Sequence, residues 1–395
     1  MVPMSLILKH IGIKGYRLLN LHHSLTVDVH VALEAEPSNC LCCGGVRLRS
    51  KGRYLRKAQH LSSFGEPARL LIHTRRLRCL DCRHTFIPAL PGVRPGRHST
   101  EPFREDVYRR HHDGVCASAL ARAFHLGAAT VERIYHQFTA RKARERLSLQ
   151  CPSILGVDEH TLHKATRFAT TFADLKNHKV FDVLPGRSPK QLHAFVAALQ
   201  GRERVRVVCI DLSSPYRALI RRWFPNARIV ADRFHVIRVV IHHFMTLARQ
   251  IAPDIKNHRG SLAILRMRPS RLSAAQKLRL LELFKTYPAF EPLYDQMQAL
   301  CELLNRKHQT KRHCRPLTRQ LLAFIDRLAA SCFEPLVTLA NTLRSWAEPI
   351  ACMWRFTKNN GITEGFHRKM KLIQRRAYGF RNFENYRLRV IAQCG

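Results

Sequence analysis

Hydrophobic and polar residues follow three different patterns along the chain, and these predict three domains. Residues 1–98 show short strand-like runs and turns that end in a loop at 91–96, where prolines and glycines interrupt regular structure. From 101 to about 149, apolar residues recur at helical spacing until Cys151-Pro152. Beyond that point strand and helix patterns alternate. We therefore expect domains over 1–98, 99–150 and 151–395.

The third domain shows three strand patterns, a helix, a strand, a second helix and a further strand. The strands are expected at 154–158, 168–175, 180–184, 205–211 and 227–232. Ser188, Pro189 and Gln191 are typical of a helix N-cap, a first helical position and a capping box. This order is that of an RNase H-like domain, in which an antiparallel meander joins a parallel βαβ part. From 234 to about 355 only helical patterns occur, which predicts a helical insertion at about 236–355.

Two short helical patterns within 99–150 flank His125-Leu126-Gly127 and predict a helix-turn-helix. The turn position usually held by glycine is His125, and histidine tolerates a left-handed backbone better than most residues. On the second helix, the polar face opposite the apolar one is the candidate DNA-binding surface. It carries Arg133, His136 and Gln137, with Arg141 beyond them. A plain helical hairpin is the alternative.

The charge balance indicates a polyanionic partner. Lysine and arginine number 67 against 28 acidic residues, a net charge of +39, while 46% hydrophobic residues suffice for a core and exclude a disordered basic tail. Phosphates would neutralise these cations, so nucleic acid is the first partner to test. The odd number of cysteines, 13, and the lack of a leader or a membrane-length apolar run predict a soluble cytoplasmic protein that makes no membrane contact.

Two matched cysteine pairs predict a structural zinc site in the N-terminal domain. Cys40-x2-Cys43 and Cys79-x2-Cys82 have the spacing with which two tight turns place four thiolates around a tetrahedral Zn2+. The interval between the pairs is long, and Cys42 could replace a neighbour; ordinary reduced thiols are the alternative. Basic residues near the cysteines would let this module bind DNA: Arg47, Arg49, Arg53, Arg75, Arg76 and Arg78.

Carboxylates at strand ends stand out in a chain so poor in acids. Asp158 is expected to close the first strand and Asp211 the fourth, and these strands would be neighbours. Both carboxylates would then project from the same end of the sheet. A third carboxylate would complete a site for two divalent cations, Mg2+ or Mn2+, which prefer oxygen ligands. Ordinary turn aspartates are the alternative.

Glu364 is the candidate third ligand, on a helix expected at 360–377. It shares a face of that helix with Arg368, Lys371 and Arg375, which suggests a metal ligand beside a phosphate-binding track. A surface Glu–Arg pair is the alternative.

Two further residues follow the fifth strand. Asp232 and His235 can approach the same site, or Asp232 can cap a helix with His235 as its partner. Glu159 is a weaker alternative to Asp158.

Over nearly its whole length the chain resembles the DDE transposases of bacterial insertion sequences, specifically the ISL-three group. The cysteine pairs, the helix-turn-helix and the runs at 156–159, 210–211, 224–227, 230–235 and 360–382 carry the resemblance. It implies Asp158, Asp211 and Glu364 as the catalytic triad. It also implies that Asp232 and His235 form the accessory D-x2-H signature found in related transposases. At position 367, within the run 360–382, the family resemblance leads us to expect asparagine, but this chain has His367.

By this resemblance the protein binds the terminal inverted repeats of an insertion sequence and catalyses Mg2+-dependent DNA cleavage and strand transfer. Water first nicks the element end, and the freed 3′-hydroxyl then attacks target DNA. Double-stranded DNA is the implied partner, two joined ends imply a homodimer or larger assembly, and the bacterial nucleoid is the implied location. The alternatives are a DNA-binding regulator derived from an inactive transposase, which needs no metal carboxylates, and a nuclease that needs no element ends.

Overall fold

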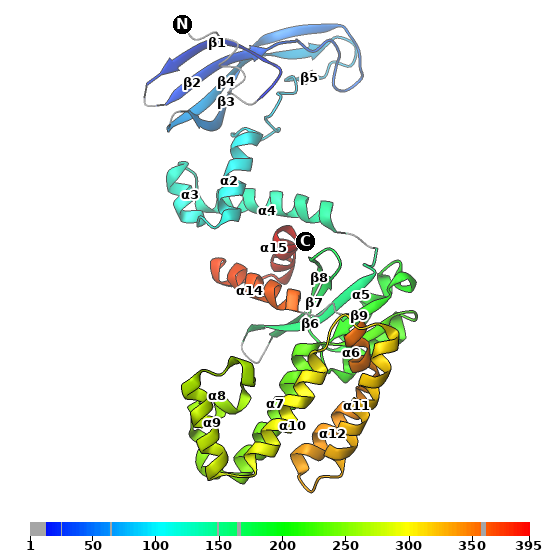
Figure 1. Ribbon diagram of the computed structural model, residues 1–395. Helices are drawn as coiled ribbons and strands as arrows, with labels where there is room; N and C mark the ends of the chain where they lie inside the picture. The colour runs from blue at the N-terminus through cyan, green and yellow to red at the C-terminus, as the bar shows by residue number, and fades with distance from the viewer. Residues whose placement is uncertain (1–12, 25, 64, 148–149, 164–166, 357–360) are drawn as a thin grey trace. The chain divides into compact units, whose positions relative to one another are not determined.

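The computed structural model describes residues 13–24, 26–63, 65–147, 150–163, 167–356 and 361–395 (Figure 1). The chain forms two compact units, Met1–Lys142 and Ala143–Gly395. The fold is α+β, as predicted. Domain boundaries near 98 and 150 stay predictions. Within the described residues, no helix is both long and apolar enough to cross a membrane.

The first unit opens with a twisted sheet that ends at a cysteine cluster. Its strands are β1 (Tyr16–His23), β2 (Val27–Leu33), β3 (Leu48–Ser63), β4 (Glu66–Cys79) and β5 (Thr85–Phe86). They lie in the order β1-β2-β4-β3, with β5 paired to β4 and only β2 and β4 parallel. Tyr16, Val31 and Leu70 are fully buried in its core.

Three helices follow: α2 (Glu101–Asp113), α3 (Ala117–Ala123) and α4 (Ala128–Arg146), of which α4 continues four residues past the end of the first unit at Lys142. They share a core that includes Phe103, Leu120 and Tyr135. The turn between α3 and α4 passes through His125 at φ 51°, the left-handed backbone expected at that position.

The second unit contains the mixed sheet predicted for an RNase H-like domain. Its strands are β6 (Ile154–His163), β7 (Arg167–Asp174), β8 (Lys179–Pro185), β9 (Val207–Ile210) and β10 (Arg228–Ala231), in the order β10-β9-β6-β7-β8. The first three strands form the antiparallel meander, and β9 and β10 join it in parallel. Helices α5 (Pro189–Ala198) and α6 (Ser214–Trp223) are the crossovers. Ser188 and Gln191 form the expected capping box.

One expectation about this sheet is wrong. Asp158 does not close the first strand, because β6 continues to His163. The reason is that the parallel pairing of β6 with β9 ends at Val157, while its antiparallel pairing with β7 continues to His163. Asp158 therefore lies inside a strand, at the point where its parallel neighbour stops.

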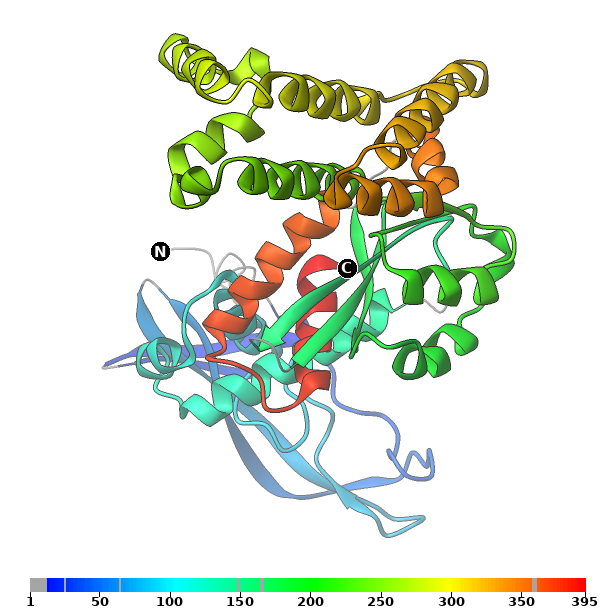
Figure 2. The ribbon, with the colours of Figure 1, turned by 90° about the horizontal axis from the view of Figure 1, so that it is seen from below.

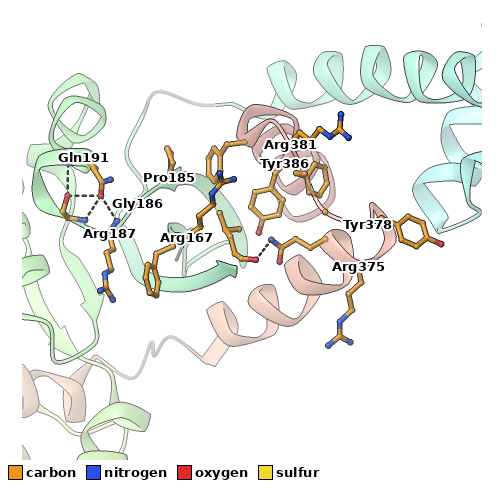
Figure 3. Close-up of a pocket in the computed structure, with 16 residues that line it drawn as sticks. Arg167, Pro185, Gly186, Arg187, Gln191, Arg375, Tyr378, Arg381 and Tyr386 are labelled. Carbon is orange, nitrogen blue, oxygen red and sulfur yellow. Dashed lines mark hydrogen bonds between the residues drawn. The ribbon is translucent and has the colours of Figure 1, made fainter. Parts of the chain in front are cut away.

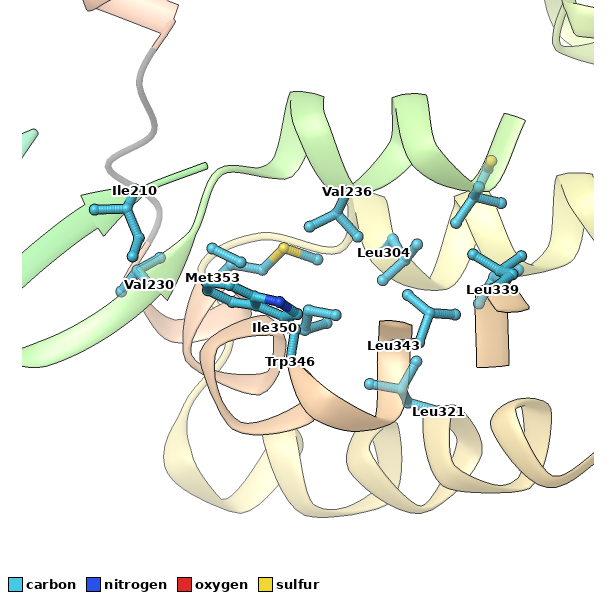
Figure 4. Packing of buried hydrophobic residues seen from close by; sticks show 14 of the residues in the cluster. Ile210, Val230, Val236, Leu304, Leu321, Leu339, Leu343, Trp346, Ile350 and Met353 are labelled. Atoms are coloured by element: carbon cyan, nitrogen blue, oxygen red, sulfur yellow. The ribbon is translucent and has the colours of Figure 1, made fainter. Parts of the chain in front are cut away.

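The predicted helical insertion is present and shares its core with the sheet. It comprises α7 (Arg233–Ile251), α8 (Arg259–Arg266), α9 (Ala274–Thr286), α10 (Phe290–Asn305), α11 (Lys311–Ala329), α12 (Glu334–Ser345) and α13 (Ala347–Arg355). Figure 4 shows Ile210 and Val230 of the sheet next to Met353, with Val236 and Ile350 in the same cluster. The apolar helices therefore support the strands β9 and β10 that precede the candidate aspartates.

The last two helices cover the meander. α14 (Gly361–Arg376) and α15 (Phe383–Cys394) lie across the sheet in Figure 2. Met370 and Tyr386 pack with Ala169 and Val183 in one buried cluster. Because neighbouring strand positions face opposite sides, Asp158 and His160 point to this α14 side while Val157 points to the core of α5 and α6.

Candidate active site

Three aspartates occupy equivalent positions on three neighbouring parallel strands. The register pairs Val157 of β6 with Ile210 of β9, and Ile210 with Ala231 of β10. The next residue on each strand is an aspartate: Asp158, Asp211 and Asp232. Neighbouring strands lie about 4.8 Å apart, so the parallel pairing gathers the three side chains at one end of the sheet.

Asp158 and Asp211 are both removed from water. Asp158 is 9% exposed and accepts a 2.8 Å hydrogen bond from the backbone N–H of Glu159. Burial, together with the charges of Asp211 and Asp232, raises the pKa of Asp158 to about 7, against the opposing effect of His235. Burial also raises the pKa of Asp211. Within the described part of the chain, the buried Oδ1 of Asp211 has no hydrogen-bond partner. Desolvated carboxylates with an unpartnered oxygen suit a divalent cation.

Asp232 and His235 form a pair at the start of α7. Asp232 is at the N-cap position, yet its side chain makes no capping hydrogen bond. It accepts instead a 2.7 Å bond from Nδ1 of His235. That bond raises the pKa of His235, and the charges of Asp158 and Asp211 act in the same direction. Asp232 thus favours the cationic form of His235 beside the other two carboxylates.

Glu364 lies outside this group. It is in the first turn of α14, 56% exposed, with an Oε1 that accepts a 2.9 Å bond from Arg368. Among the residues that the structure describes, only the four cysteines below form a set of three or more candidate metal ligands within 4.8 Å of one another. The strand register brings Asp158, Asp211 and Asp232, with His235, to one end of the sheet, but they do not form such a set, and Glu364 is on α14.

His367 connects that helix to Asp158. Its Nδ1 lies 3.8 Å from Oδ2 of Asp158, and its Nε2 lies 3.2 Å from Oγ1 of Thr171. Burial lowers the pKa of His367 to about 4, so the imidazole is neutral at neutral pH and the contact with Asp158 is not an ion pair. His367 is one helical turn after Glu364, whose charge raises its pKa slightly against the effect of burial.

A series of hydrogen bonds continues from Thr171 to residues behind the aspartates. Thr171 hydrogen-bonds Nδ1 of His160 at 3.2 Å, and Nε2 of His160 hydrogen-bonds the hydroxyl of Tyr386 at 2.8 Å. Burial lowers the pKa of His160 to about 3. Sequence reasoning missed this chain. The spacing of Asp158 and His160, two apart on one strand face, was the available signal, but Thr171 and Tyr386 come from other elements.

The cysteine cluster has the dimensions of a tetrathiolate zinc site. Sγ of Cys40 lies 3.6 Å from that of Cys82, and Sγ of Cys43 lies 3.7 Å from that of Cys79. Four sulfurs at about 2.3 Å from a tetrahedral zinc are about 3.8 Å apart. Cys42 is exposed and outside the cluster, so it does not replace a neighbour. Backbone N–H groups of Cys43 and Cys42 lower the pKa of Cys40 to about 7, which favours its thiolate.

Two protein families match long stretches of this chain. Residues 155–390 match the ISL3-group family model described as Transposase, and residues 36–82 match one described as zinc-finger of transposase IS204/IS1001/IS1096/IS1165. The chain belongs to the ISL3 group of DDE transposases. It is 28% identical over 385 residues to the transposase for insertion sequence element IS1001 of Bordetella parapertussis, across 93% of this chain and 91% of that protein.

The zinc finger of this transposase therefore contains the predicted ligands Cys40, Cys43, Cys79 and Cys82 and is suited to a structural Zn2+. On the helix-turn-helix, Arg133, Gln137 and Arg141 are exposed on α4 and His136 is half-buried. Gln137 accepts a hydrogen bond from Arg104 of α2.

The cations that follow Glu364 on α14 of the transposase are exposed. Arg368 is paired with Glu364, while Lys371 and Arg375 lie further along the same helix; a phosphate-binding track there stays a prediction. Arg375 lines a cavity at the far end of the helix (Figure 3).

Proposed function

We propose that this transposase binds the terminal inverted repeats of its insertion sequence and catalyses metal-dependent strand cleavage and strand transfer. The observation that carries the proposal is the row of aspartates, in which Asp158 is desolvated and Asp211 keeps a buried oxygen without a partner. Burying carboxylates without compensation is costly, and a divalent cation offsets that cost. In a chain of net charge +39, the phosphates of DNA are the matching substrate.

Asp158, Asp211 and Glu364 are the residues we assign to Mg2+ or Mn2+. When bound, such a cation supplies activation of the attacking oxygen and charge stabilisation of the leaving oxygen. Glu364 would exchange its exposed ion pair with Arg368 for this role, at small cost because exposed pairs contribute about 0–1 kcal/mol.

Asp232 and His235 are assigned an accessory role beside the metal ligands. Asp232 fixes His235 through Nδ1, which leaves Nε2 to donate to a phosphate oxygen or a water at the reacting end. In this reaction water attacks at the element end, and the resulting 3′-hydroxyl then attacks the target strand.

The zinc finger and the helix-turn-helix are assigned to the inverted repeats. On the β3–β4 hairpin, Arg49 lies opposite Arg78 and Arg53 opposite Arg75. Like charges directly across a strand pair destabilise it, and phosphates on the hairpin would relieve that repulsion. On α4, the exposed Arg133 and Arg141 would contact DNA, and Arg368, Lys371 and Arg375 of α14 would follow the strand toward the aspartates. Joining two ends calls for a homodimer or larger assembly on DNA.

The deciding experiment uses the full chain, a duplex that carries the terminal inverted repeat, and Mg2+. Nicked and joined products are resolved on a denaturing gel, and duplex affinity is measured in parallel. Asp211→Asn, which removes one negative charge without changing the shape of the side chain, should abolish both products and keep binding. The matched control is Asp326→Asn, because Asp326 forms an exposed pair with Arg344 on another helix.

Each outcome separates the proposal from its alternatives. Products that persist in Asp211→Asn would overturn the catalytic assignment. A wild-type chain that binds the repeat and never cuts it would be the DNA-binding regulator. Cleavage of duplexes that lack the repeat, at the same rate as those that carry it, would indicate a nuclease.

A further inference from the structure

A cavity of about 810 Å3 opens at the far end of α14 from Glu364. Its walls are the β6–β7 hairpin, the segment before α5 and the loop between α14 and α15 (Figure 3). This volume is within the range of about 300–1,000 Å3 typical of small-molecule sites. No residue of the proposed metal site lines it.

The cavity is strongly cationic. Arg167, Arg187, Arg375 and Arg381 line it, and no aspartate or glutamate of the described residues does so. Arg187 is 3.7 Å from Glu159 and stacks 4.0 Å from the Phe168 ring. Arg167, Arg375 and Arg381 are exposed and form no ion pair with any residue that the structure describes. Guanidinium groups without counterions are suited to phosphate.

Aromatic rings form the rest of the lining. Phe168, Phe380 and Phe383 contribute to the walls, and Tyr378 lies on the loop that borders the cavity, with its ring directed outward (Figure 3). Tyr378 is 96% exposed, the most exposed of the large hydrophobic residues that the structure describes. Its backbone is left-handed, at φ 51°, in the turn that ends α14. A bulky residue with positive φ is uncommon, and here that conformation presents the ring to solvent. Aromatic faces beside arginines are the surfaces on which proteins stack unpaired bases.

Two elements lead from the aspartates to this cavity. His367 of α14 touches Asp158, while Gln374 of α14 donates a 3.4 Å hydrogen bond to the carbonyl of Leu162. From Asp158 to Leu162 is about 13 Å along a strand, and from His367 to Gln374 about 10 Å along a helix. These lengths equal three or four nucleotides of a stacked strand at about 3.4 Å each. Lys371 lies on the helix between these two residues, and Arg375 directly follows Gln374.

We infer that this cavity binds one unpaired nucleotide of the DNA strand, within about four nucleotides of the phosphate that is cut. The base stacks on Tyr378 and the phenylalanines, and the flanking phosphates contact Arg167, Arg375 and Arg381. A paired base cannot enter a cavity, so the nucleotide leaves the helix, as bases do when enzymes take them into pockets. The location relative to the cut rests on the proposed function; the preference for an unpaired nucleotide does not.

The test compares two duplexes that are identical except for one unpaired thymidine. Affinity for the full chain is measured by fluorescence anisotropy without Mg2+, at raised salt so that general phosphate contacts are weakened. We expect roughly tenfold tighter binding of the duplex with the unpaired nucleotide, the contribution of one stacked base. Tyr378→Ala should remove this preference and leave the affinity for the paired duplex unchanged, while Tyr378→Phe should keep it.

Phe333→Ala is the matched control, because Phe333 is also an exposed aromatic residue but lies outside the cavity, at the start of α12. A second measurement uses 4-thiothymidine at the unpaired position. Photo-cross-linking should attach the nucleotide to the peptide that contains Tyr378. A cross-link elsewhere would overturn the inference.

The outcomes distinguish the cavity from the proposed function. Equal affinity for both duplexes, in a chain that cuts the inverted repeat with Mg2+, would overturn the cavity assignment alone. A preference that Tyr378→Ala removes, in a chain that never cuts, would support the cavity and overturn the transposition chemistry. If Tyr378→Ala instead weakens self-association and changes neither affinity, the cavity is a protein interface and the inference is wrong.

Discussion

The imidazole of His367 lies between Asp158 and Thr171, with Nδ1 at 3.8 Å from the carboxylate and Nε2 at 3.2 Å from the hydroxyl. This residue, on α14, is where the family resemblance suggests asparagine. Its position shows how α14, which carries Glu364 one turn earlier, is held against the strand that carries Asp158. The distance between Asp158 and Glu364 therefore depends on a contact that Glu364 itself does not make.

We expect His367→Ala to slow strand cleavage by about 10–100-fold, because residues that orient metal ligands have effects of that size. His367→Asn should retain most of the rate, since an amide can still hydrogen-bond Thr171. Both variants should bind the duplex like the wild type, and the single-turnover rate is the measurement. Equal loss of rate in both variants would show that the imidazole itself is needed.

The buried His160 predicts a stability change with pH. Burial lowers its pKa from 6.5 in the unfolded chain to about 3 in the folded one. Its contribution is therefore fully present above pH 6.5 and is lost progressively as the pH falls toward 3, because the unfolded state binds the proton more tightly. His160→Gln should flatten the pH dependence of the denaturation midpoint across this window. His242→Gln, at an exposed histidine, should not change it.

Zinc removal should unfold the cysteine end of the N-terminal sheet. Cys43→Ser removes one of four ligands, so we expect zinc content to fall from about one ion per chain, with loss of duplex binding. Cys42→Ser is the matched control, because Cys42 is exposed and outside the cluster. Metal analysis of the purified variants measures the effect. Normal zinc content in Cys43→Ser would contradict the ligand assignment.

The ion pair that attaches α15 to β8 should be important for stability. Arg387 donates two bonds to Asp182, at 2.6 and 2.7 Å, and Asp182 is 3% exposed. Asp182→Asn leaves a largely buried guanidinium without its full partner, and should lower the free energy of unfolding by about 3 kcal/mol. Asp326→Asn, which breaks an exposed pair, should cost less than about 1 kcal/mol. Chemical denaturation compares them, and equal effects would contradict the prediction.

On the predicted DNA-binding face of α4, we expect Arg133 to contact DNA and Gln137 to stabilise the fold. Arg133 is exposed, so Arg133→Ala should weaken binding of the inverted repeat by about tenfold, the effect of losing one base contact. Gln137 accepts from the buried Arg104, so Gln137→Ala should lower thermal stability and leave the affinity of the folded protein unchanged. Anisotropy and thermal denaturation separate the two. If the Arg133→Ala variant binds the inverted repeat normally, Arg133 does not contact DNA and the prediction is wrong.

Local patterns were enough to predict much of this architecture. The succession of strands and helices along the second unit, the Ser188 capping box, the left-handed His125 and the helical insertion all depend on residues close together in the chain, where periodicity, capping and turn chemistry act. The two cysteine pairs were predictable for the same reason, because each short spacing is a single turn. Parallel pairing then brings Asp158 and Asp211 together once the strand order is known.

Only the tertiary structure decided how far the strands extend and what supports the aspartates. Whether β6 ends at Asp158 depends on its pairing with β7, and the contact of His367 depends on how α14 packs, which no local pattern encodes. The pKa values of Asp158 and His160 follow from burial by elements distant in sequence. The sequence by itself determined the elements, the ligand types and the family resemblance. Packing determined the burial of the aspartates, the contact of His367 with Asp158 and the arginine-lined cavity, because those depend on contacts between distant residues.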